Sequence, residues 1–405
     1  MGGERSISAL KVLHVVPSLG LRHGGVSVSI RELCYGLARL GVGVQVWTTS
    51  RAYDPPIDGP TDDRLRSAGV GVRYFPVHPW GWLGQRYAYS PALSAALREG
   101  VWEADLVHIH ALWLHPTRAA AQTCQQVGRP YIVSPCGALD PYSLRIHWPL
   151  KRAYGLWIER RTLAGAAAVH FTSSQEQNQS DMLGTSPATF VVPRCLETDS
   201  IPATLPRSFR QQHPSIGESK ILLFLGRLHP KKRLDIVARA FILAARRRGD
   251  LHLVISGPED GSGPPVRKLL QEAGMLDRTT FTGLLAGKEK WAAFRESSLF
   301  LLPSEDENFG MGALEAMSCG IPVLLSRQVG ISAAAEHAGA GIVLEQNPSS
   351  WAEAIDQLLK NPQRMQDLGE AGRRLAEGEF SCRQVASAMR QAYLDVLKRS
   401  QPVRP

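Results

Sequence analysis

SEDENFGMGALEAMSCGIPVL, residues 304–324, comes shortly after an apolar run at 299–302 that is typical of a buried strand. Glu307 falls in the loop after this strand, and FGMG (309–312) leads into a predicted helix that contains Glu315. Open α/β sheets bind ligands at the carboxyl ends of their strands, and a helix N-terminus attracts anions. The stretch therefore predicts an α/β fold with a ligand site at the end of this strand.

Glu307 and Glu315 belong to different parts of this segment, one before the helix and one within it. We therefore expect them to contact different parts of one extended ligand. A carboxylate can accept two hydrogen bonds from neighbouring hydroxyls, which suits a ribose or a hexose. A capping glutamate and a surface glutamate would explain each residue alone, but the glycines between them, which let backbone N–H groups approach a ligand, favour a ligand site.

Strand and helix patterns alternate along nearly the whole chain, which predicts parallel sheets covered by helices on both faces. The strand patterns lie at 11–17, 44–48, 71–76, 106–110, 131–134, 167–172 and 189–192, and then at 220–225, 251–256, 279–282, 299–302, 323–325 and 342–344.

The chain of 405 residues suits two domains of about 200 residues each. A polar, proline-containing stretch at 193–212 has no periodicity and is the predicted linker. We therefore expect domains at 1–200 and 213–380, followed by a last amphipathic helix at 381–398.

A second segment, LFLGRLHPKKRLDIVARA (223–240), begins within the first strand of the second half and is rich in basic residues. Arg227 and Lys232 both lie near the carboxyl end of that strand, where two cations could flank a diphosphate. A solvated basic turn is the alternative. Positive charge at a helix N-terminus opposes the helix dipole, which favours a ligand.

The first half offers weaker signals. Gly24 and Gly25 stand between a strand and a helix, but no G-x-G-x-x-G or Walker sequence is present, and a tight turn explains the pair alone. His108 and His110 share one face of a predicted strand. A metal pair is conceivable, but no third ligand stands out, and histidines satisfied within the core are the commoner outcome.

Bulk composition narrows the class of protein. The net charge of +9 is dispersed and accompanies no nucleic-acid-binding motif, so it favours an anionic small ligand or a membrane surface. No apolar run approaches the ~20 residues of a membrane span, and the six cysteines lack ligand spacing, so we expect a cytoplasmic protein. The basic and aromatic stretch 142–161 is either a helix on the inner face of an anionic membrane or a packed surface helix.

With these segments in place, the chain resembles glycosyltransferase family four, the retaining group 1 glycosyltransferases. Glu307 through Glu315 look like the family's paired-glutamate signature, and Arg227 through Lys232 look like its diphosphate-binding segment. Arg233 departs from the glycine that the family commonly has there, which puts the local turn in doubt. The resemblance implies a GT-B fold, in which two Rossmann-like doubly wound domains face each other across a cleft and the last helix returns to the first domain.

The resemblance also implies roles for single residues. Arg227 and Lys232 would neutralise the leaving diphosphate, and Glu315 would hold the ribose hydroxyls. Glu307 would contact the donor sugar, together with the N–H groups of Phe309, Gly310 and Met311. Gly24 and Gly25 would approach the diphosphate. His110 would contact a sugar hydroxyl or an acceptor hydroxyl.

The implied activity is transfer of a sugar from a nucleotide-diphosphate sugar, with UDP-sugars placed before GDP-sugars, to a glycan or lipid-linked glycan. The family reacts on the front face, needs no cofactor or metal, and does not use the two-carboxylate geometry of hydrolases. The absence of an Asp-x-Asp donor-metal signature fits this expectation. The alternatives are another GT-B activity, such as an epimerase, and a catalytically inactive protein that binds sugar nucleotides; the presence of Glu307 and His110 argues against the second.

Overall fold

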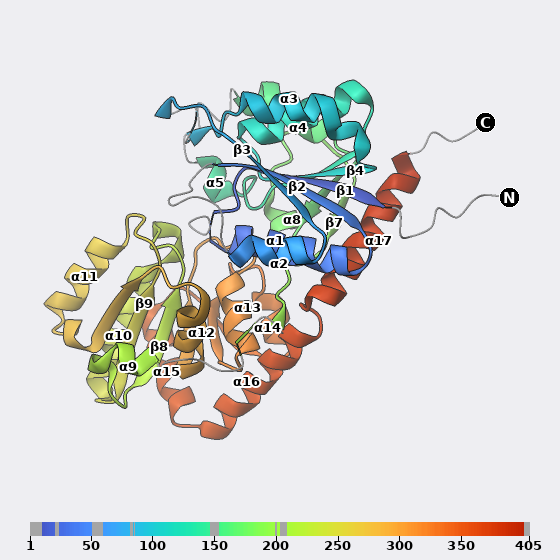
Figure 1. The fold of residues 1–405 in the computed structure, drawn as a ribbon. Coiled ribbons are helices and arrows are strands. Elements are labelled where there is room, and N and C mark those ends of the chain that lie inside the picture. The colour runs from blue at the N-terminus through green and yellow to red at the C-terminus, as the bar shows by residue number, and fades with distance from the viewer. Residues whose placement is uncertain are drawn as a thin grey trace. The chain divides into compact units, whose positions relative to one another are not determined.

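The computed structural model describes residues 10–20, 24–50, 60–81, 84, 86–145, 154–198, 201–202 and 209–400. The chain divides into two compact units. Unit 1 runs to Cys195 and resumes at Cys382, and unit 2 is Leu196–Ser381. The chain thus leaves unit 1 within the predicted linker and returns to it with its last helix (Figure 1).

The described part of unit 1 forms a seven-stranded parallel sheet in the order β3-β2-β1-β4-β5-β6-β7. Its strands are β1 (Lys11–Val16), β2 (Gly43–Thr49), β3 (Gly71–Phe75), β4 (Leu106–His110), β5 (Tyr131–Ser134), β6 (Ala168–Phe171) and β7 (Thr189–Val191). Its helices are α1 (Gly25–Arg39), α2 (Pro60–Ser67), α3 (Pro91–Gly100), η4 (Val101–Glu103), α4 (His115–Val127), α5 (Pro141–Arg145), the π-helix η5 (Gly155–Glu159), α7 (Arg160–Ala164), α8 (Ser174–Gln179) and α17 (Cys382–Ser400).

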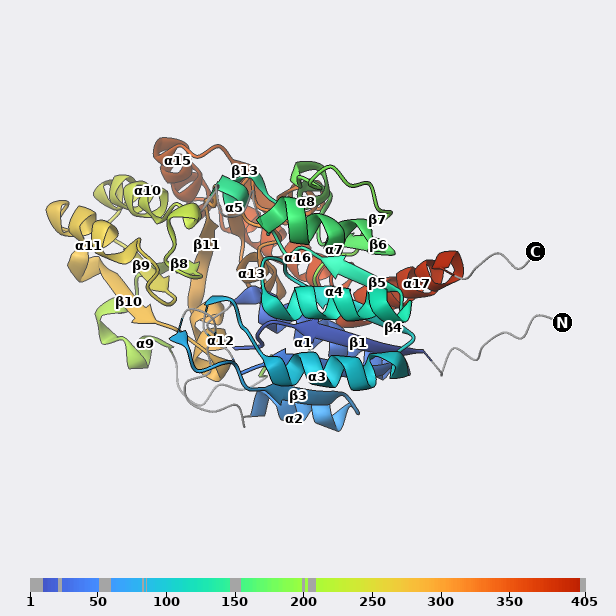
Figure 2. The ribbon, with the colours of Figure 1, turned by 90° about the horizontal axis from the view of Figure 1, so that it is seen from above.

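Helices cover both faces of this sheet, so its central strands β1 and β4 are almost continuously buried. α3 and α4 lie side by side over one face, seen from above in Figure 2. α1 and α17 cover the other face (Figure 1). They pack so closely that a Cβ atom on Gly36 would lie 2.9 Å from Cβ of Ala386. The last helix of the chain is therefore part of the unit 1 core.

The described part of unit 2 forms a six-stranded parallel sheet in the order β10-β9-β8-β11-β12-β13. Its strands are β8 (Lys220–Leu225), β9 (Leu251–Ser256), β10 (Thr279–Gly283), β11 (Ser297–Leu302), β12 (Val323–Ser326) and β13 (Gly341–Leu344). Its helices are α9 (Phe209–Gln212), η7 (Pro214–Ile216), η8 (Pro230–Lys232), α10 (Leu234–Arg247), α11 (Gly263–Glu272), η9 (Leu276–Arg278), α12 (Gly287–Glu296), α13 (Met311–Ser318), α14 (Ser332–His337), α15 (Pro348–Leu359) and α16 (Pro362–Glu377).

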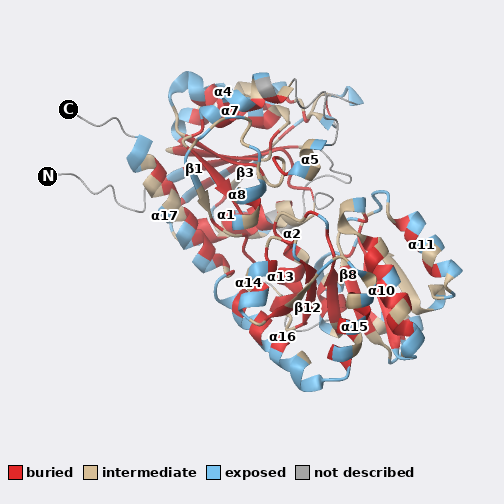
Figure 3. Ribbon diagram, turned by 180° about the vertical axis from the view of Figure 1, so that it is seen from behind, coloured by how far each residue is buried: buried red, intermediate tan, exposed pale blue. Residues whose placement is uncertain are grey.

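The strand order locates the ligand edge of each sheet. In both units the chain builds outward from a first strand to one side and then crosses to the other side, so the order reverses between β1 and β4 and between β8 and β11. Ligands of doubly wound sheets bind beyond the carboxyl ends of the strands at this reversal. Figure 3 shows that both sheets are largely buried, so the residues that can contact a ligand lie in the loops at the sheet edges.

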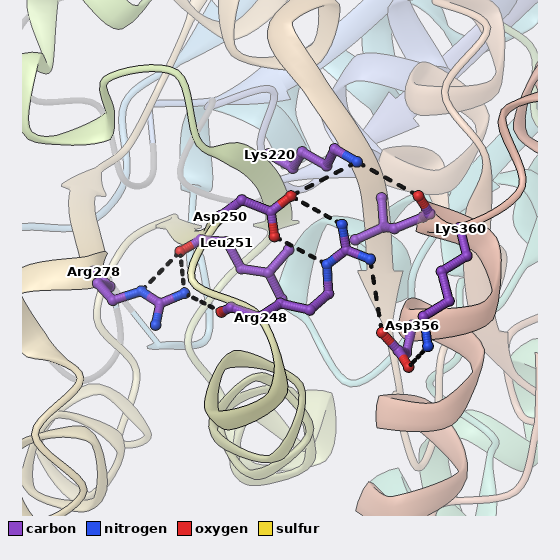
Figure 4. Close-up of polar contacts among 8 residues, drawn as sticks. Lys220, Arg248, Asp250, Leu251, Arg278, Asp356 and Lys360 are labelled. Atoms are coloured by element: carbon purple, nitrogen blue, oxygen red, sulfur yellow. Dashed lines mark hydrogen bonds and ion pairs between the residues drawn. The ribbon is translucent and has the colours of Figure 1, made fainter.

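An ion-pair network occupies the opposite edge of the unit 2 sheet, where β8 and β9 begin (Figure 4). Arg248 binds the carboxylate of Asp250 at two points, 3.0 and 2.9 Å. Arg278 donates to the carbonyl oxygens of Leu251 at 3.0 and 3.1 Å and of Arg248 at 2.8 Å. These contacts join the strand starts to the neighbouring loops and lie away from the ligand edge, so their role is structural.

The structure confirms the two doubly wound parallel sheets and every predicted strand. Within the basic and aromatic stretch 142–161, the structure describes helical residues up to Arg145 in α5 and again from Tyr154 onward. Residues 146–153, with part of the basic and aromatic sequence, lie outside the described residues. Among the described residues, no helix combines the length and apolar character that crossing a membrane requires.

Candidate functional site

The candidate site in unit 2 is built around Lys232 and Glu307. Lys232 ends η8, in the connection that follows β8, and Glu307 lies in the loop that follows β11. Since β8 and β11 are neighbours in the sheet, the two loops meet, and Lys232 Nζ forms an ion pair with Glu307 Oε2. Both side chains are largely buried, with 13% and 17% of their surface exposed. Two predicted site residues that are 75 positions apart in sequence are thus in contact.

Charged side chains of both signs surround this pair. Lys231 lies 3.8 Å from the carboxylate of Asp306, and the guanidinium of Arg227 lies 2.9 Å from Asp260. Burial lowers the pKa of Lys232, and the charges of Lys231 and Arg227 lower it further, while Asp306 opposes them. Burial is the main cause of the lowered pKa, and an anionic ligand would stabilise the protonated form of this buried amine.

Arg233 resolves the doubt about the turn after Lys232. Its backbone is left-handed, with φ 51° and ψ 47°, a conformation that glycine adopts without cost. The side chain is held at two points by Asp235, with both N–O distances 3.0 Å, and at a third point by Gln346 at 3.1 Å. The turn that glycine commonly makes in the family therefore forms here with an arginine fastened to its neighbours.

The loop from Glu307 to α13 is fixed by its backbone. Glu307 N–H donates to Gln328 at 3.1 Å, and its carbonyl accepts from Gly330 at 2.9 Å. Gly310 takes φ 104° before α13, and a Cβ atom there would lie 2.7 Å from Val329. Phe309 and Met311 are buried beside it. Only glycine fits at position 310, and it directs the start of α13 toward the ligand edge.

Glu315 lies on α13 with 6% of its side chain exposed. Its Oε1 accepts a 2.8 Å hydrogen bond from Nζ of Lys290, which lies on α12. Glu307 and Glu315 therefore have different cationic partners. Lys290 was not predicted from the sequence, because no motif marks a lysine on a helix 25 residues before its partner.

Backbone also crowds the end of β8. Gly257, which follows β9, has φ 145°, and a Cβ atom there would lie 1.8 Å from the carbonyl oxygen of Gly226. Gly226 in turn donates its N–H to Ser256 at 2.9 Å. The backbone therefore closes tightly around the segment that carries Arg227.

In unit 1, Gly24 and Gly25 lie at the N-terminus of α1, where Gly24 is the cap residue with φ 69°. A Cβ atom on Gly24 would meet nothing within 4 Å among the described residues. Residues 21–23 of this loop lie outside the described residues. The glycine pair therefore follows β1, at the strand-order reversal of its own sheet.

His110 ends β4, the strand beside β1, and 3% of its surface is exposed. It lines a pocket of unit 1 together with Ser134, Thr172 and the buried Arg194. The structure adds a third histidine to the predicted pair, since His14 on β1 brings its ring within 4.8 Å of the ring nitrogens of His108 and His110. His14 was not predicted from the sequence, although a histidine within the otherwise apolar strand segment KVLHVV could have indicated it.

The connection after His110 is strained and held by a buried acid. Ala111 and Trp113 both have φ 67°. Glu159 accepts the N–H of Trp113 at 2.7 Å, and burial raises the pKa of Glu159 to about 7. Strained backbone of this kind persists where surrounding contacts enforce it and is concentrated at functional sites. The sequence analysis did not identify Glu159.

The structure thus assembles the predicted residues in two groups. The group at the ligand edge of unit 2 contains Arg227, Lys232, Glu307, Phe309, Gly310, Met311 and Glu315. The group at the corresponding edge of unit 1 contains Gly24, Gly25 and His110.

Comparison with known proteins matches both halves of the chain to glycosyltransferase families. The family profile described as "Glycosyl transferases group 1" matches residues 207–375, and that described as "Glycosyl transferase 4-like domain" matches residues 24–195. The D-inositol 3-phosphate glycosyltransferase of Kineococcus radiotolerans is 28% identical over 91% of this chain and 90% of its own length. The enzyme of the same name from Stackebrandtia nassauensis is 27% identical over 93% of this chain and 88% of its own length.

Solved structures agree on the fold. Anabaena HepE in complex with UDP and glucose superposes with a TM-score of 0.73 at 19% identity, covering 95% of this chain and 100% of that one. Sucrose-phosphate synthase from Thermosynechococcus elongatus gives 0.72 at 21% identity, covering 96% and 100%. WaaG, a glycosyltransferase of lipopolysaccharide biosynthesis, gives 0.66 at 17% identity, covering 94% and 99%.

Proposed function

Because this chain belongs to the group 1 glycosyltransferases, with one of their domains in each half, we propose that it transfers a sugar from a nucleotide-diphosphate sugar with retention of anomeric configuration. The observation that carries the proposal is the buried Lys232–Glu307 pair at the strand-order reversal of unit 2. It supplies a desolvated cation for a phosphate and a carboxylate for hydroxyls in one place.

The cations act on the leaving group. Arg227 offers a planar fork and Lys232 a point charge, and both stabilise the negative charge that develops on the diphosphate as the glycosidic bond breaks. The bond from the anomeric carbon to the phosphate oxygen breaks, and the acceptor oxygen bonds to the same face of that carbon. The departing phosphate oxygen takes the acceptor's proton, so no protein base and no metal enter the reaction.

The glutamates orient the donor. Glu307, with the N–H groups at the start of α13, binds hydroxyls of the transferred sugar, and Glu315 binds the ribose hydroxyls. Each carboxylate holds a lysine in the free protein. Donor binding therefore exchanges the Lys232–Glu307 contact for a Lys232–phosphate contact, which leaves Glu307 free to accept hydrogen bonds. In unit 1, Gly24 and Gly25 approach the diphosphate, and His110 contacts a sugar or acceptor hydroxyl.

A UDP-sugar is the first donor to test, and the Anabaena HepE structure, which contains UDP and glucose, supports this choice. The acceptor is a glycan or a lipid-linked glycan at the inner face of a membrane, which suits a chain of net charge +9. The curated relatives are named for an inositol phosphate, a second anionic acceptor. Both acceptor classes belong in the same assay.

The test is thermal unfolding of the protein with UDP, GDP, ADP and their sugar conjugates, in EDTA and without it. A ligand that binds only the folded state stabilises it by about 2.7 kcal/mol at 100 times its Kd. We expect a shift with one nucleotide that EDTA leaves unchanged and that Lys232→Ala and Glu315→Ala weaken. Lys231→Ala, which removes the neighbouring lysine that is paired with Asp306, is the matched control and retains most of the shift.

Other outcomes point elsewhere. No shift with any nucleotide at millimolar concentration would refute the donor site. A shift without transfer to any acceptor, and without hydrolysis or epimerisation of the donor sugar, would favour a catalytically inactive protein that binds sugar nucleotides. A shift that EDTA abolishes would contradict metal-independent binding.

A further inference from the structure

A row of polar side chains crosses the layer between the unit 1 sheet and helices α1 and α17. It consists of His14 on β1, His108 and His110 on β4, His170 on β6 and Tyr393 on α17. All five residues are buried. Their contacts join residues that lie up to 379 positions apart in the chain. Four histidines in one layer of core need a physical account, because each must find hydrogen-bond partners there.

The row has an end whose hydrogen-bond direction is unambiguous. His170 Nε2 lies 2.8 Å from the carbonyl oxygen of Val192, which can only accept. Nε2 of His170 therefore carries the proton. Burial lowers the pKa of His170 to about 4, so the ring is neutral and its Nδ1 is an acceptor.

The direction then passes along the row. His108 Nε2 lies 3.4 Å from His170 Nδ1 and must donate to it. His108 Nδ1 is consequently an acceptor, and it takes the hydroxyl proton of Tyr393 at 2.7 Å. With its only proton committed, the Tyr393 oxygen accepts from His14 Nε2 at 3.5 Å.

His110 is the last member. His14 Nδ1, left as an acceptor, receives the proton of His110 Nε2 at 3.0 Å. Burial and the charge of Arg194 keep the pKa of His110 well below its ordinary value, and His14 and His170 would add repulsion if they were protonated. His110 is therefore neutral, with its proton on Nε2 and a lone pair on Nδ1.

The opposite direction fails at the carbonyl. Suppose instead that His108 donates to Tyr393 and Tyr393 donates to His14, which leaves a lone pair on His108 Nε2. If His170 is protonated at Nε2, its Nδ1 lone pair then faces the lone pair of His108. If His170 is protonated at Nδ1, its Nε2 lone pair faces the carbonyl oxygen of Val192. Either arrangement leaves a buried polar group unsatisfied, which destabilises the folded protein. Of the two directions, only the first pairs a donor with an acceptor at every contact along the row.

A bound cation is the competing account of His14, His108 and His110. A divalent ion there would be buried among neutral imidazoles, with the charge of Arg194 nearby and no carboxylate in the triad to offset it. It would also displace two of the hydrogen bonds just described. The hydrogen-bonded row needs no such compensation, so we favour it.

We propose that His14 and Tyr393 are positioning residues that hold His110 as the Nε2–H tautomer, so that its Nδ1 accepts a hydrogen bond from a substrate hydroxyl. The choice of ligand rests on the proposed glycosyl transfer, whereas the tautomer does not. An acceptor nitrogen selects a hydroxyl that donates, and it stays an acceptor throughout the working pH range because the ring does not titrate there. The last helix of the chain thereby sets the chemistry of a residue on the fourth strand.

The first test is nuclear magnetic resonance of the whole protein with ¹⁵N-labelled histidine, using one-bond and two-bond couplings to assign the protonated ring nitrogen. His110→Asn and His14→Asn identify the two resonances. We expect His14 and His110 to be neutral Nε2–H forms from about pH 6 to about pH 8, across the ordinary histidine pKa. Protonation of His110 at Nδ1, or titration of its ring in this range, would overturn the proposal, as would displacement of these resonances by one equivalent of Zn²⁺.

Tyr393→Phe tests the coupling. Without the hydroxyl, His14 Nε2–H loses its acceptor, and His14 can instead protonate at Nδ1 and donate to His110. We expect His110 to shift to the Nδ1–H tautomer. Tyr131→Phe is the matched control, since Tyr131 is equally buried on β5 and hydrogen-bonded to Gln125 and Thr162 outside the row. An unchanged His110 tautomer in folded Tyr393→Phe would overturn the role of Tyr393.

A kinetic comparison separates positioning from general damage. Tyr393→Phe should lower kcat/KM for the sugar donor about tenfold, the worth of one hydrogen bond, while stabilisation by the nucleotide diphosphate is unchanged. Tyr131→Phe should keep both. Equal kinetic loss in the two variants would refute a specific effect of Tyr393 on His110. Failure of the nucleotide shift in the unaltered protein would count against the proposed function and leave the tautomer measurement intact.

Discussion

Arg233 and Asp235 are joined by a two-point ion pair, Nε to Oδ1 and Nη2 to Oδ2 at 3.0 Å each, that holds Arg233 in left-handed backbone. The pair forms directly after Lys232, the buried cation of the candidate site. Because left-handed backbone costs a non-glycine residue about 1 kcal/mol, the ion pair offsets strain at the point where the site is shaped.

Asp235→Ala should therefore lower the free energy of unfolding by about 0.5–1 kcal/mol, since it removes a half-exposed ion pair and leaves the strain. In an Arg233→Gly background the same change should cost close to nothing, because the strain and the partner are already gone. Urea unfolding of the four proteins of this double-mutant cycle measures the difference. Equal costs in both backgrounds would show that Asp235 does not act through Arg233.

Nucleotide-diphosphate affinity should fall as the pH rises from about 7 to about 9, below the ordinary lysine pKa of about 10.4. Burial and neighbouring cations lower the pKa of Lys232 in the free protein. A bound diphosphate stabilises the protonated amine, so binding raises this pKa and takes up a proton. Calorimetry in buffers of different ionisation enthalpy measures the uptake. Lys232→Arg keeps its charge and should flatten the profile; release of protons, or an affinity that rises with pH, would contradict the prediction.

Gly310→Ala should destabilise the protein by about 2 kcal/mol or more and weaken nucleotide binding. The new Cβ would combine φ 104° with a 2.7 Å approach to Val329 at the start of α13. Gly339→Ala is the control for backbone strain alone, because Gly339 has φ 65° and, within the described residues, open space around its Cβ position. It should cost about 1 kcal/mol and leave binding unchanged. Similar effects of the two substitutions on binding would argue against a role for the geometry at Gly310.

Arg278→Met should lower the free energy of unfolding by about 2 kcal/mol, because the guanidinium donates to the carbonyl oxygens of Ala245, Arg248 and Leu251 at the non-ligand edge of unit 2. Figure 4 shows the contacts with Arg248 and Leu251. Nucleotide stabilisation, measured as the increment in melting temperature, should stay as in the unaltered protein. Lys360→Ala, which removes an exposed partner of Asp356, should change stability by less than about 0.5 kcal/mol. A lost nucleotide increment in Arg278→Met would show that this edge communicates with the site.

The fold was predictable because its signals are local. Alternating apolar strands and amphipathic helices, with glycines where strands end, predict the parallel sheets before any contact is known. The site in unit 2 was predictable for a related reason. Lys232 and Glu307 each follow a strand, and strands of one parallel sheet end at a common edge, so their meeting follows from chain direction and strand order.

Other partners were not predictable, because nothing local marks them. Lys290 is an unremarkable helix residue until α12 brings it to Glu315. Glu159 lies in the stretch 142–161 that was predicted as a helix, and the π-helical turn there places its carboxylate at the backbone N–H of Trp113. Helical periodicity describes which face a residue occupies and says little about what lies opposite.

The amino-acid sequence by itself determined the two doubly wound sheets, the family and the strand ends at which charged residues gather, because these depend on periodicity and on order along the chain. The tertiary structure alone decided the histidine row. His14, His108, His170 and Tyr393 come from three strands and the last helix, and their proton order is set by the carbonyl of Val192. Hydrogen-bond direction passes from neighbour to neighbour in space, so it is a property of the packed layer and has no signature in the linear chain.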